Sequence, residues 1–118
     1  MLLKSICSIA VLLLLTLPIR LDAHAVLVKS SPAAGSTITG TFLPVSVTFN
    51  SKIDAARSKI TLVGPGQSEQ ALAIRGGNAP NTLNAEADHL KPGPYRLEWQ
   101  VLAIDGHITR GQIPFTVK

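Results

Sequence analysis

Short runs of alternating apolar and polar residues, separated by proline, glycine, asparagine and serine, make up most of the chain after residue 24. Positions 45, 47 and 49 are apolar with polar residues between them, and every second position from Tyr95 to Val101 repeats the pattern around Trp99. A period of two is typical of strands with one buried face. We therefore predict an all-β sandwich or barrel with these apolar faces in its core and Trp99 at its centre.

The same pattern predicts where the strands begin and end. Turn sequences such as SSPAAG, GPGQ, GGNAPN and KPGP separate them. No window shows a helical period over twelve residues, and at most Ala55–Arg57 forms a turn. The predicted strands are Ala25–Lys29, Ser36–Thr41, Val45–Asn50, Ile60–Val63, Ala71–Arg75, Thr82–Ala87, Gly93–Ala103 and Gln112–Lys118.

The first 23 residues have a different pattern from the rest. Lys4 precedes an apolar run from Ile6 to Leu17, and a short polar stretch ends at Ala23. This order predicts a secretory signal peptide over residues 1–23. A membrane anchor is the alternative, but the apolar run is shorter than the roughly 20 residues that span a bilayer. Cleavage after Ala23 makes His24 the first residue of a single exported domain over residues 24–118.

Composition limits the chemistry available to that domain. The only cysteine and the only methionine, Cys7 and Met1, both lie in the predicted signal peptide, so residues 24–118 have neither a disulfide nor a sulfur ligand. The chain carries a net charge of +4, with its basic residues scattered singly. Dispersed cations are typical of a solvated surface, and we expect no nucleic-acid partner.

The segment WQVLAIDGHITRG places Asp105, Gly106 and His107 between two apolar strands. Asp-Gly makes a turn readily, and residues two apart leave the same side of an extended chain. An amino-terminal His24 would add its imidazole Nδ1 and its α-amine, whose pKa is ordinarily about 7.7–8.0 and which must lose its proton to bind a metal. Three nitrogens and one carboxylate oxygen form a donor set that suits Cu(II).

Each of these features also has a plain structural interpretation. His24 can be an ordinary chain end, and Asp-Gly-His is a common hairpin turn. The third histidine, His89, lies beside Asp88 in a polar stretch before a turn. We interpret His89 as a solvated loop residue, with a weak accessory metal site as the alternative.

Taken together, three segments resemble the CopC copper-binding domains. The opening HAVLVKSSPAAGS is similar to the pattern His-x-x-Leu-x-x-Ser-x-Pro-Ala-x-Gly, LPVSVTFNSKI is similar to a second strand of that family, and LKPGPYRLEWQVLAIDGHITRGQIPFTV follows its closing pattern. The resemblance spans residues 24 to 118. The opening motif maps onto His24, Leu27, Ser30, Pro32, Ala33 and Gly35.

The resemblance implies a periplasmic copper-binding protein on a small Greek-key, immunoglobulin-like β-sandwich of about seven to eight strands. It implies one Cu(II) ion per mature chain, held by His24, Asp105 and His107, and a role in copper resistance or homeostasis through sequestration or delivery. A membrane copper permease of the same system is the implied partner. The protein itself is expected not to be inserted stably in a membrane and not to be an enzyme.

Two departures from the family narrow this prediction. Some members have a glutamate in the segment where this chain has Asn50, Ser51 and Lys52, so that carboxylate is absent here. Some members also have a methionine-rich loop for Cu(I), which residues 24–118 lack. We therefore predict a site for Cu(II) alone.

Two other functions compete with this prediction. Copper-dependent oxidative enzymes that cleave polysaccharides also bind copper through an amino-terminal histidine and a second histidine. Catalytic copper needs an open coordination position, however, and Asp105 would fill that position here. The second alternative is a metal-free β-sandwich used for adhesion or assembly.

Overall fold

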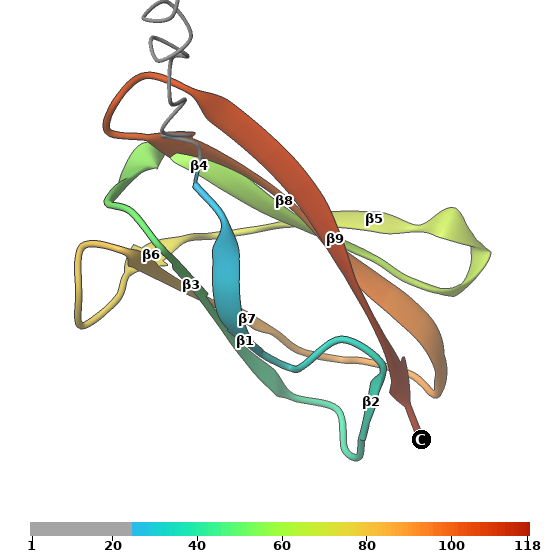
Figure 1. Ribbon diagram of the computed structural model, residues 1–118. Coiled ribbons are helices and arrows are strands. Elements are labelled where there is room, and N and C mark those ends of the chain that lie inside the picture. Colours follow the sequence, from blue (N-terminus) through green and yellow to red (C-terminus); the bar gives the residue numbers. More distant parts are fainter. Residues whose placement is uncertain (1–24) are drawn as a thin grey trace, which may run out of the picture.

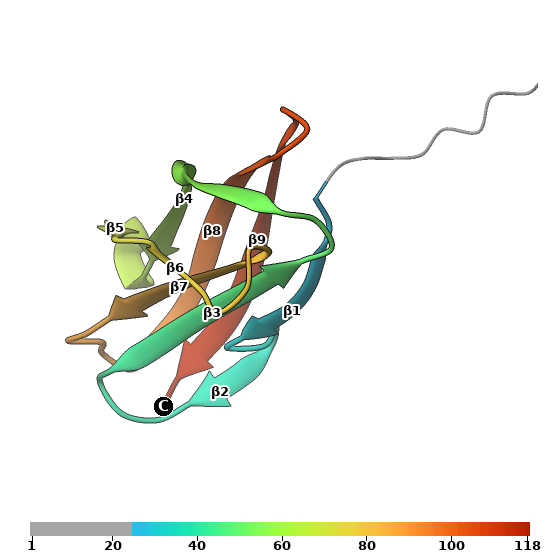
Figure 2. The same ribbon diagram turned by 90° about the vertical axis from the view of Figure 1, so that its left-hand side faces the viewer.

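The computed structural model describes residues 25–118, which fold into two layered β-sheets (Figures 1 and 2). The first sheet has four strands in the order β1 (Leu27–Ser31), β3 (Leu43–Phe49), β7 (Thr82–Ala87) and β6 (Arg75–Gly76). The second has five, in the order β2 (Ser36–Ile38), β9 (Ile108–Val117), β8 (Gly93–Ala103), β4 (Ile53–Val63) and β5 (Glu69–Leu72), with a 3-10 turn η2 (Pro65–Gln67) after β4. Strand neighbours are mostly not consecutive in the chain, as in a Greek-key sandwich, which confirms the predicted fold class.

The core lies between the two sheets and contains the predicted apolar faces. Trp99 packs edge-on against Phe49 with ring centroids 5.0 Å apart, and Tyr95 stacks on Phe115 at 5.5 Å. No polar or charged residue is buried among those described. Burial of a large apolar side chain contributes roughly 1.5–3 kcal/mol, and the largest fully buried ones are Phe49, Ile60, Leu83, Leu97, Ile113, Val47, Val63 and Val101.

Strands β7 and β8 have the predicted bounds, whereas β4 begins at Ile53 rather than at Ile60. Ile53 pairs with Ala103 and Asp54 with Leu102, but the register then shifts before Lys59 pairs with Gln100. The four residues at 55–58 therefore form a bulge, which interrupts the alternation that identifies a strand in a sequence.

Strand β9 also begins earlier than predicted, at Ile108 rather than Gln112. Glycine is disfavoured in strands, so Gly111 does not indicate a strand at this position. In the structure Gly111 pairs with Trp99, and a Cβ atom at Gly111 would lie 2.3 Å from Trp99 Cζ2. The indole of Trp99 therefore covers Gly111 and occupies the space that a side chain at position 111 would need.

Strand β1 spans Leu27–Ser31 rather than Ala25–Lys29, and β3 spans Leu43–Phe49 rather than Val45–Asn50. Two further differences occur where the chain changes sheet. The predicted strand Ala71–Arg75 divides into β5, which pairs with β4, and β6, which pairs with β7 in the other sheet. Strand β2 ends at Ile38, shortly before Gly40 with its φ of 96°. Residues 25–118 thus contain nine strands, two of them no longer than three residues.

Candidate metal centre

The hairpin between β8 and β9 projects from one end of the sandwich (Figure 2). The Gly106 N–H donates to the Ala103 carbonyl at 2.9 Å, and the Ala103 N–H donates to the His107 carbonyl at 2.9 Å. Gly106 has a φ of 93°, which glycine adopts without steric cost. This tight turn confirms the hairpin expected from the Asp-Gly pair and presents residues 105 and 107 to solvent.

Asp105 and His107 contact each other within this turn. One carboxylate oxygen of Asp105, Oδ1, accepts the backbone N–H of His107 at 3.0 Å, and the other, Oδ2, lies 3.1 Å from His107 Nδ1. Their side chains are 29% and 56% exposed, respectively. With its hydrogen on Nδ1, the ring donates to the carboxylate and keeps the lone pair of Nε2 for a ligand, an arrangement common among histidines that bind metals.

The start of the described chain lies at the same end of the sandwich as this hairpin (Figures 1 and 2). Ala25 is buried, and its carbonyl accepts a hydrogen bond of 3.2 Å from the Thr109 hydroxyl. Thr109 follows His107 by two residues on β9. The backbone next to position 24 is therefore tied to the strand that begins directly after the turn.

Asn50 forms two hydrogen bonds with the backbone of Val26, the residue that follows Ala25. Its Oδ1 accepts the backbone N–H of Val26 at 2.8 Å, and its own N–H donates to the Val26 carbonyl at 3.0 Å. In the sequence, Asn50 stands out only as a position without a carboxylate. The structural roles of Asn50 and Thr109 depend on contacts between segments that are distant in the sequence. The pattern of apolar and polar residues does not predict such contacts.

The predicted site residues are thus partly brought together. Asp105 and His107 are in contact, whereas His24 lies outside the described residues 25–118. His89 is exposed in the loop before β8, and since β8 runs from Gly93 to Ala103 at the turn, His89 lies at the other end of that strand. Among the described residues, no group of three or more His, Cys, Asp or Glu side chains is arranged to hold a metal.

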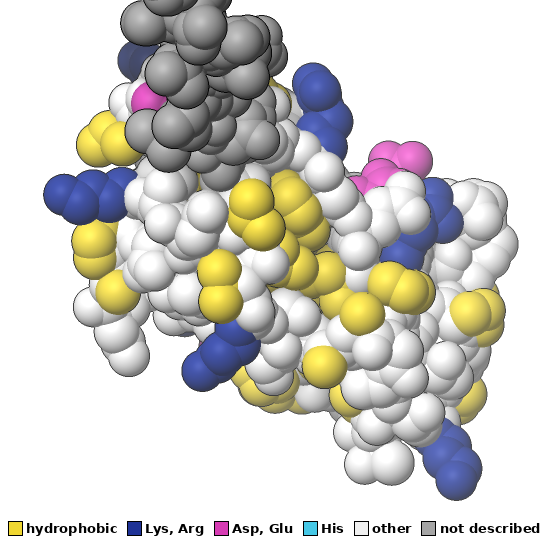
Figure 3. Space-filling model, viewed as in Figure 1, with side chains coloured by type: hydrophobic (Ala, Val, Ile, Leu, Met, Phe, Trp, Pro, Cys, Tyr) yellow, Lys and Arg dark blue, Asp and Glu magenta, His cyan; other side chains and the backbone are white. Residues whose placement is uncertain are grey.

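The surface at large shows dispersed charge. Lys and Arg side chains lie singly on the face in Figure 3, without a continuous basic patch there. Ion pairs such as Arg75 with Glu86 at 2.9 Å lie on exposed positions. Within residues 25–118, no helix has the length and apolar character needed to cross a bilayer.

Comparison with known proteins identifies related sequences. The family model for the CopC domain matches residues 27–118. The chain is 30% identical to protein YobA of Escherichia coli K12 over 99 residues, which cover 81% of this chain and 80% of that protein. It is also 30% identical to copper resistance protein C of Xanthomonas campestris over 104 residues, 81% of each. Copper transport protein CutJ of Bacillus subtilis is 30% identical over 112 residues, which are 92% of this chain but only 21% of CutJ.

Solved structures with a similar fold include the following two. CopC from Methylosinus trichosporium OB3b has a TM-score of 0.75 and 29% identity, with 80% of this chain and 94% of that one covered. PcoC from Escherichia coli, described as a methionine-rich copper resistance protein, has a TM-score of 0.64 and 27% identity, covering 81% of this chain and 100% of that one.

Proposed function

The chain belongs to the CopC family of copper-related proteins, and on that premise we propose that it is an exported protein that binds a single Cu(II) ion. The proposed ligands are the α-amine and imidazole of His24, the imidazole of His107 and the carboxylate of Asp105. The role that follows is copper resistance or homeostasis, through sequestration or delivery of the ion.

One observation supports this proposal above the others: the hydrogen bond between the Thr109 hydroxyl and the Ala25 carbonyl. Ala25 directly follows His24 in the chain, and Thr109 lies two residues after His107. Had the chain started at the other end of the sandwich, the amine and the Asp-Gly-His turn would be separated by the length of a strand. Their shared end makes one coordination sphere built from both parts of the sequence feasible.

The donor types favour Cu(II) over other ions. Two imidazoles, an amine and a carboxylate supply three nitrogens and one oxygen, and Cu(II) has the highest affinity for such donors among the divalent first-row metals. Cu(I) prefers thiolate and thioether ligands, and residues 24–118 contain neither cysteine nor methionine. In this respect the chain differs from the methionine-rich PcoC.

Asp105 has two roles in this proposal. Its contacts with His107 orient the ring so that Nε2 is directed away from the carboxylate. The carboxylate lies on the Nδ1 side of the ring, so the same ion can bind Nε2 and Asp105 only if the Nδ1 contact opens when copper binds; the bond from the His107 N–H to Oδ1 can remain. A carboxylate in the fourth position also leaves less room for oxygen or peroxide at the copper, which favours a carrier over an enzyme.

The cellular context follows from the proposed signal peptide and the relatives. The proposed signal peptide directs export, in a Gram-negative bacterium to the periplasm, and cleavage after Ala23 releases residues 24–118. A membrane copper permease is the proposed partner, supported by CutJ, a named copper transport protein in which the matched region is a fifth of a longer chain. Ile104 and Ile108, 72% and 50% exposed beside the ligands, offer apolar surface for such a contact.

Titration of the processed protein, residues 24–118, with Cu(II) tests the proposal. One ion should bind per chain, with an electron paramagnetic resonance (EPR) spectrum typical of nitrogen-rich tetragonal copper. Absence of tight binding would support the metal-free adhesion alternative instead. Turnover of ascorbate and oxygen on a polysaccharide would support the oxidative enzyme.

A further inference from the structure

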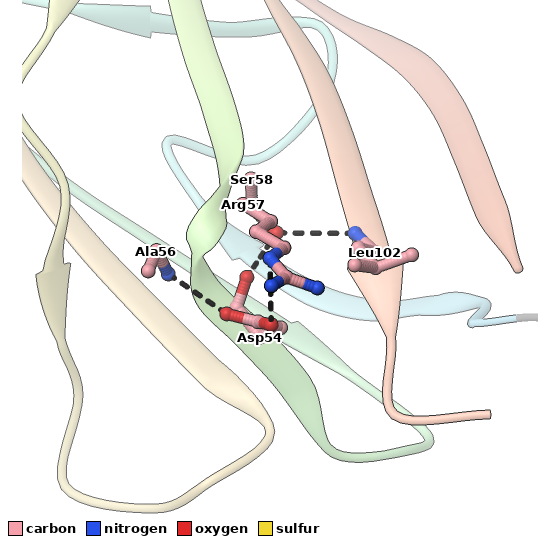
Figure 4. Close-up of polar contacts among 5 residues, drawn as sticks. All are labelled: Asp54, Ala56, Arg57, Ser58 and Leu102. Atoms are coloured by element: carbon pink, nitrogen blue, oxygen red, sulfur yellow. Dashed lines mark hydrogen bonds and ion pairs between the residues drawn. The ribbon is translucent and has the colours of Figure 1, made fainter. Parts of the chain in front are cut away.

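The β4 bulge lies beside the stem of the Asp-Gly-His hairpin and is bridged by one side chain, Ser58 (Figure 4). Four residues, 55–58, lie opposite the single residue Val101, between the paired positions Asp54 with Leu102 and Lys59 with Gln100. A bulge of this kind interrupts the ladder and bends its strand. The backbone groups around it need other partners because unpaired buried polar groups cost free energy.

Ser58 supplies these partners. Its hydroxyl accepts the backbone N–H of Leu102 at 3.1 Å and donates to the carbonyl of Asp54 at 2.7 Å. The hydroxyl therefore takes the place of a ladder bond and links the two strands across the bulge. Both bonds are partly buried, which reduces competition from water.

The Asp54 side chain stabilises the same bulge. Its Oδ1 accepts the backbone N–H of Ala56 at 3.1 Å, and its Oδ2 lies 3.9 Å from Arg57 Nε (Figure 4). The ion pair is exposed and contributes little, whereas the bond to Ala56 closes a local turn. The bulge is thus an ordered junction between β4 and β8.

The residues just before this junction also contact the stem of the hairpin. Ile53 pairs with Ala103, and the Lys52 carbonyl accepts the Ile104 N–H at 3.1 Å. Together with the Ser58 bond, these contacts fix positions 102 to 104 directly before Asp105. On its other side the stem pairs with β9, from Leu102 with Ile108 onward.

We propose that Ser58 is a positioning residue for the copper site: its hydroxyl, through Leu102, sets the place of the turn that carries Asp105 and His107. This inference depends on the proposed function, since it concerns ligands of that site. Ser58 lies on a different strand from these ligands, so its effect is transmitted through the backbone of β8.

Three variants of the processed protein test the proposal. Ser58→Ala removes the hydroxyl, and Ser58→Thr retains it. Ser36→Ala is the control: Ser36 lies on β2, away from the hairpin, and its hydroxyl also donates to a backbone carbonyl, that of Ala33, at 2.7 Å. We expect Ser58→Ala to lower Cu(II) affinity by on the order of tenfold, the low end for groups that orient metal ligands, and to alter the EPR spectrum. Ser58→Thr should restore both, and Ser36→Ala should change neither.

A purely structural role would give a different result. If Ser58→Ala lowered only the melting temperature and left affinity and spectrum unchanged in the folded protein, the proposal would be overturned. Absence of Cu(II) binding by the wild type would instead overturn the proposed function, and the positioning role with it.

Hydrogen exchange provides a test without copper and without dependence on the folding of a variant. In the wild-type protein the Leu102 and Ile104 amides should both exchange slowly, because Leu102 donates to the Ser58 hydroxyl on β4 and Ile104 donates to the Lys52 carbonyl just before β4. In folded Ser58→Ala both should exchange faster. A wild-type Leu102 amide that exchanges as fast as amides in exposed loops would contradict the proposed bond and overturn the inference.

Discussion

The Thr109 hydroxyl donates a hydrogen bond of 3.2 Å to the Ala25 carbonyl, joining residues 84 positions apart in the sequence. Through this bond the beginning of the folded domain is attached to the strand that follows the Asp-Gly-His turn. If Cu(II) binds ligands from both segments, the bond prepares the site before the ion arrives, which lowers the ordering cost of binding.

Thr109→Val should therefore weaken Cu(II) binding, by roughly tenfold, as found when groups that orient ligands are removed. Loss of one hydrogen bond should also lower the free energy of unfolding by about 0.5–1.5 kcal/mol. Isothermal titration calorimetry measures the affinity, and Thr116→Val, an exposed position at the far end of β9, is the matched control. Equal affinities for the two variants would show that the bond does not prepare the site.

Asp105→Ala should lower Cu(II) affinity by at least about tenfold, because His107 loses the group that orients its ring and the ion loses an oxygen donor. The opened coordination position should also raise the rate of ascorbate oxidation per bound copper. Both quantities are measured on copper-loaded protein and compared with the wild type. An unchanged affinity together with an unchanged oxidation rate would exclude Asp105 from the site.

His89→Ala should leave the EPR spectrum of bound Cu(II) unchanged, since His89 lies at the end of β8 remote from the turn. His107→Ala, which removes the same side chain from the proposed site, should change the nitrogen hyperfine pattern. A change in the His89 variant would identify that residue as a ligand, contrary to its placement.

Gly111→Ala should destabilise the fold, because the new Cβ atom would lie 2.3 Å from Trp99 Cζ2. Overpacking of this kind costs about 1–3 kcal/mol. Gly76→Ala is the control, since a Cβ atom there meets nothing within 4 Å. Urea unfolding followed by the fluorescence of Trp99, the only tryptophan, measures both variants. A Gly111 variant as stable as the control would mean that the indole can move aside.

The fold could be predicted where alternation is uninterrupted. Strands β7 and β8 have the predicted bounds because apolar residues occupy every second position and face one core. The first halves of β4 and β9 could not be predicted, since the bulge at 55–58 disrupts the pattern and Gly111 is accepted only because Trp99 covers it.

The site could be predicted in its ligand types but not in its support. Asp105 and His107 are two residues apart on a turn, so their contact follows from local geometry. The bonds made by Thr109, Asn50 and Ser58 join segments from different strands. Such contacts depend on how the two sheets and their loops come together, which the spacing of residues along the chain does not determine.

We propose above all that the amine of His24 binds copper, and a comparison of two proteins decides whether it does. The EPR spectrum and Cu(II) affinity of protein that begins at His24 are measured beside those of protein with one additional glycine before His24. Conversion of the amine to an amide should remove a nitrogen ligand, change the hyperfine pattern and sharply weaken binding. The same affinity and the same spectrum in both proteins would contradict the claim.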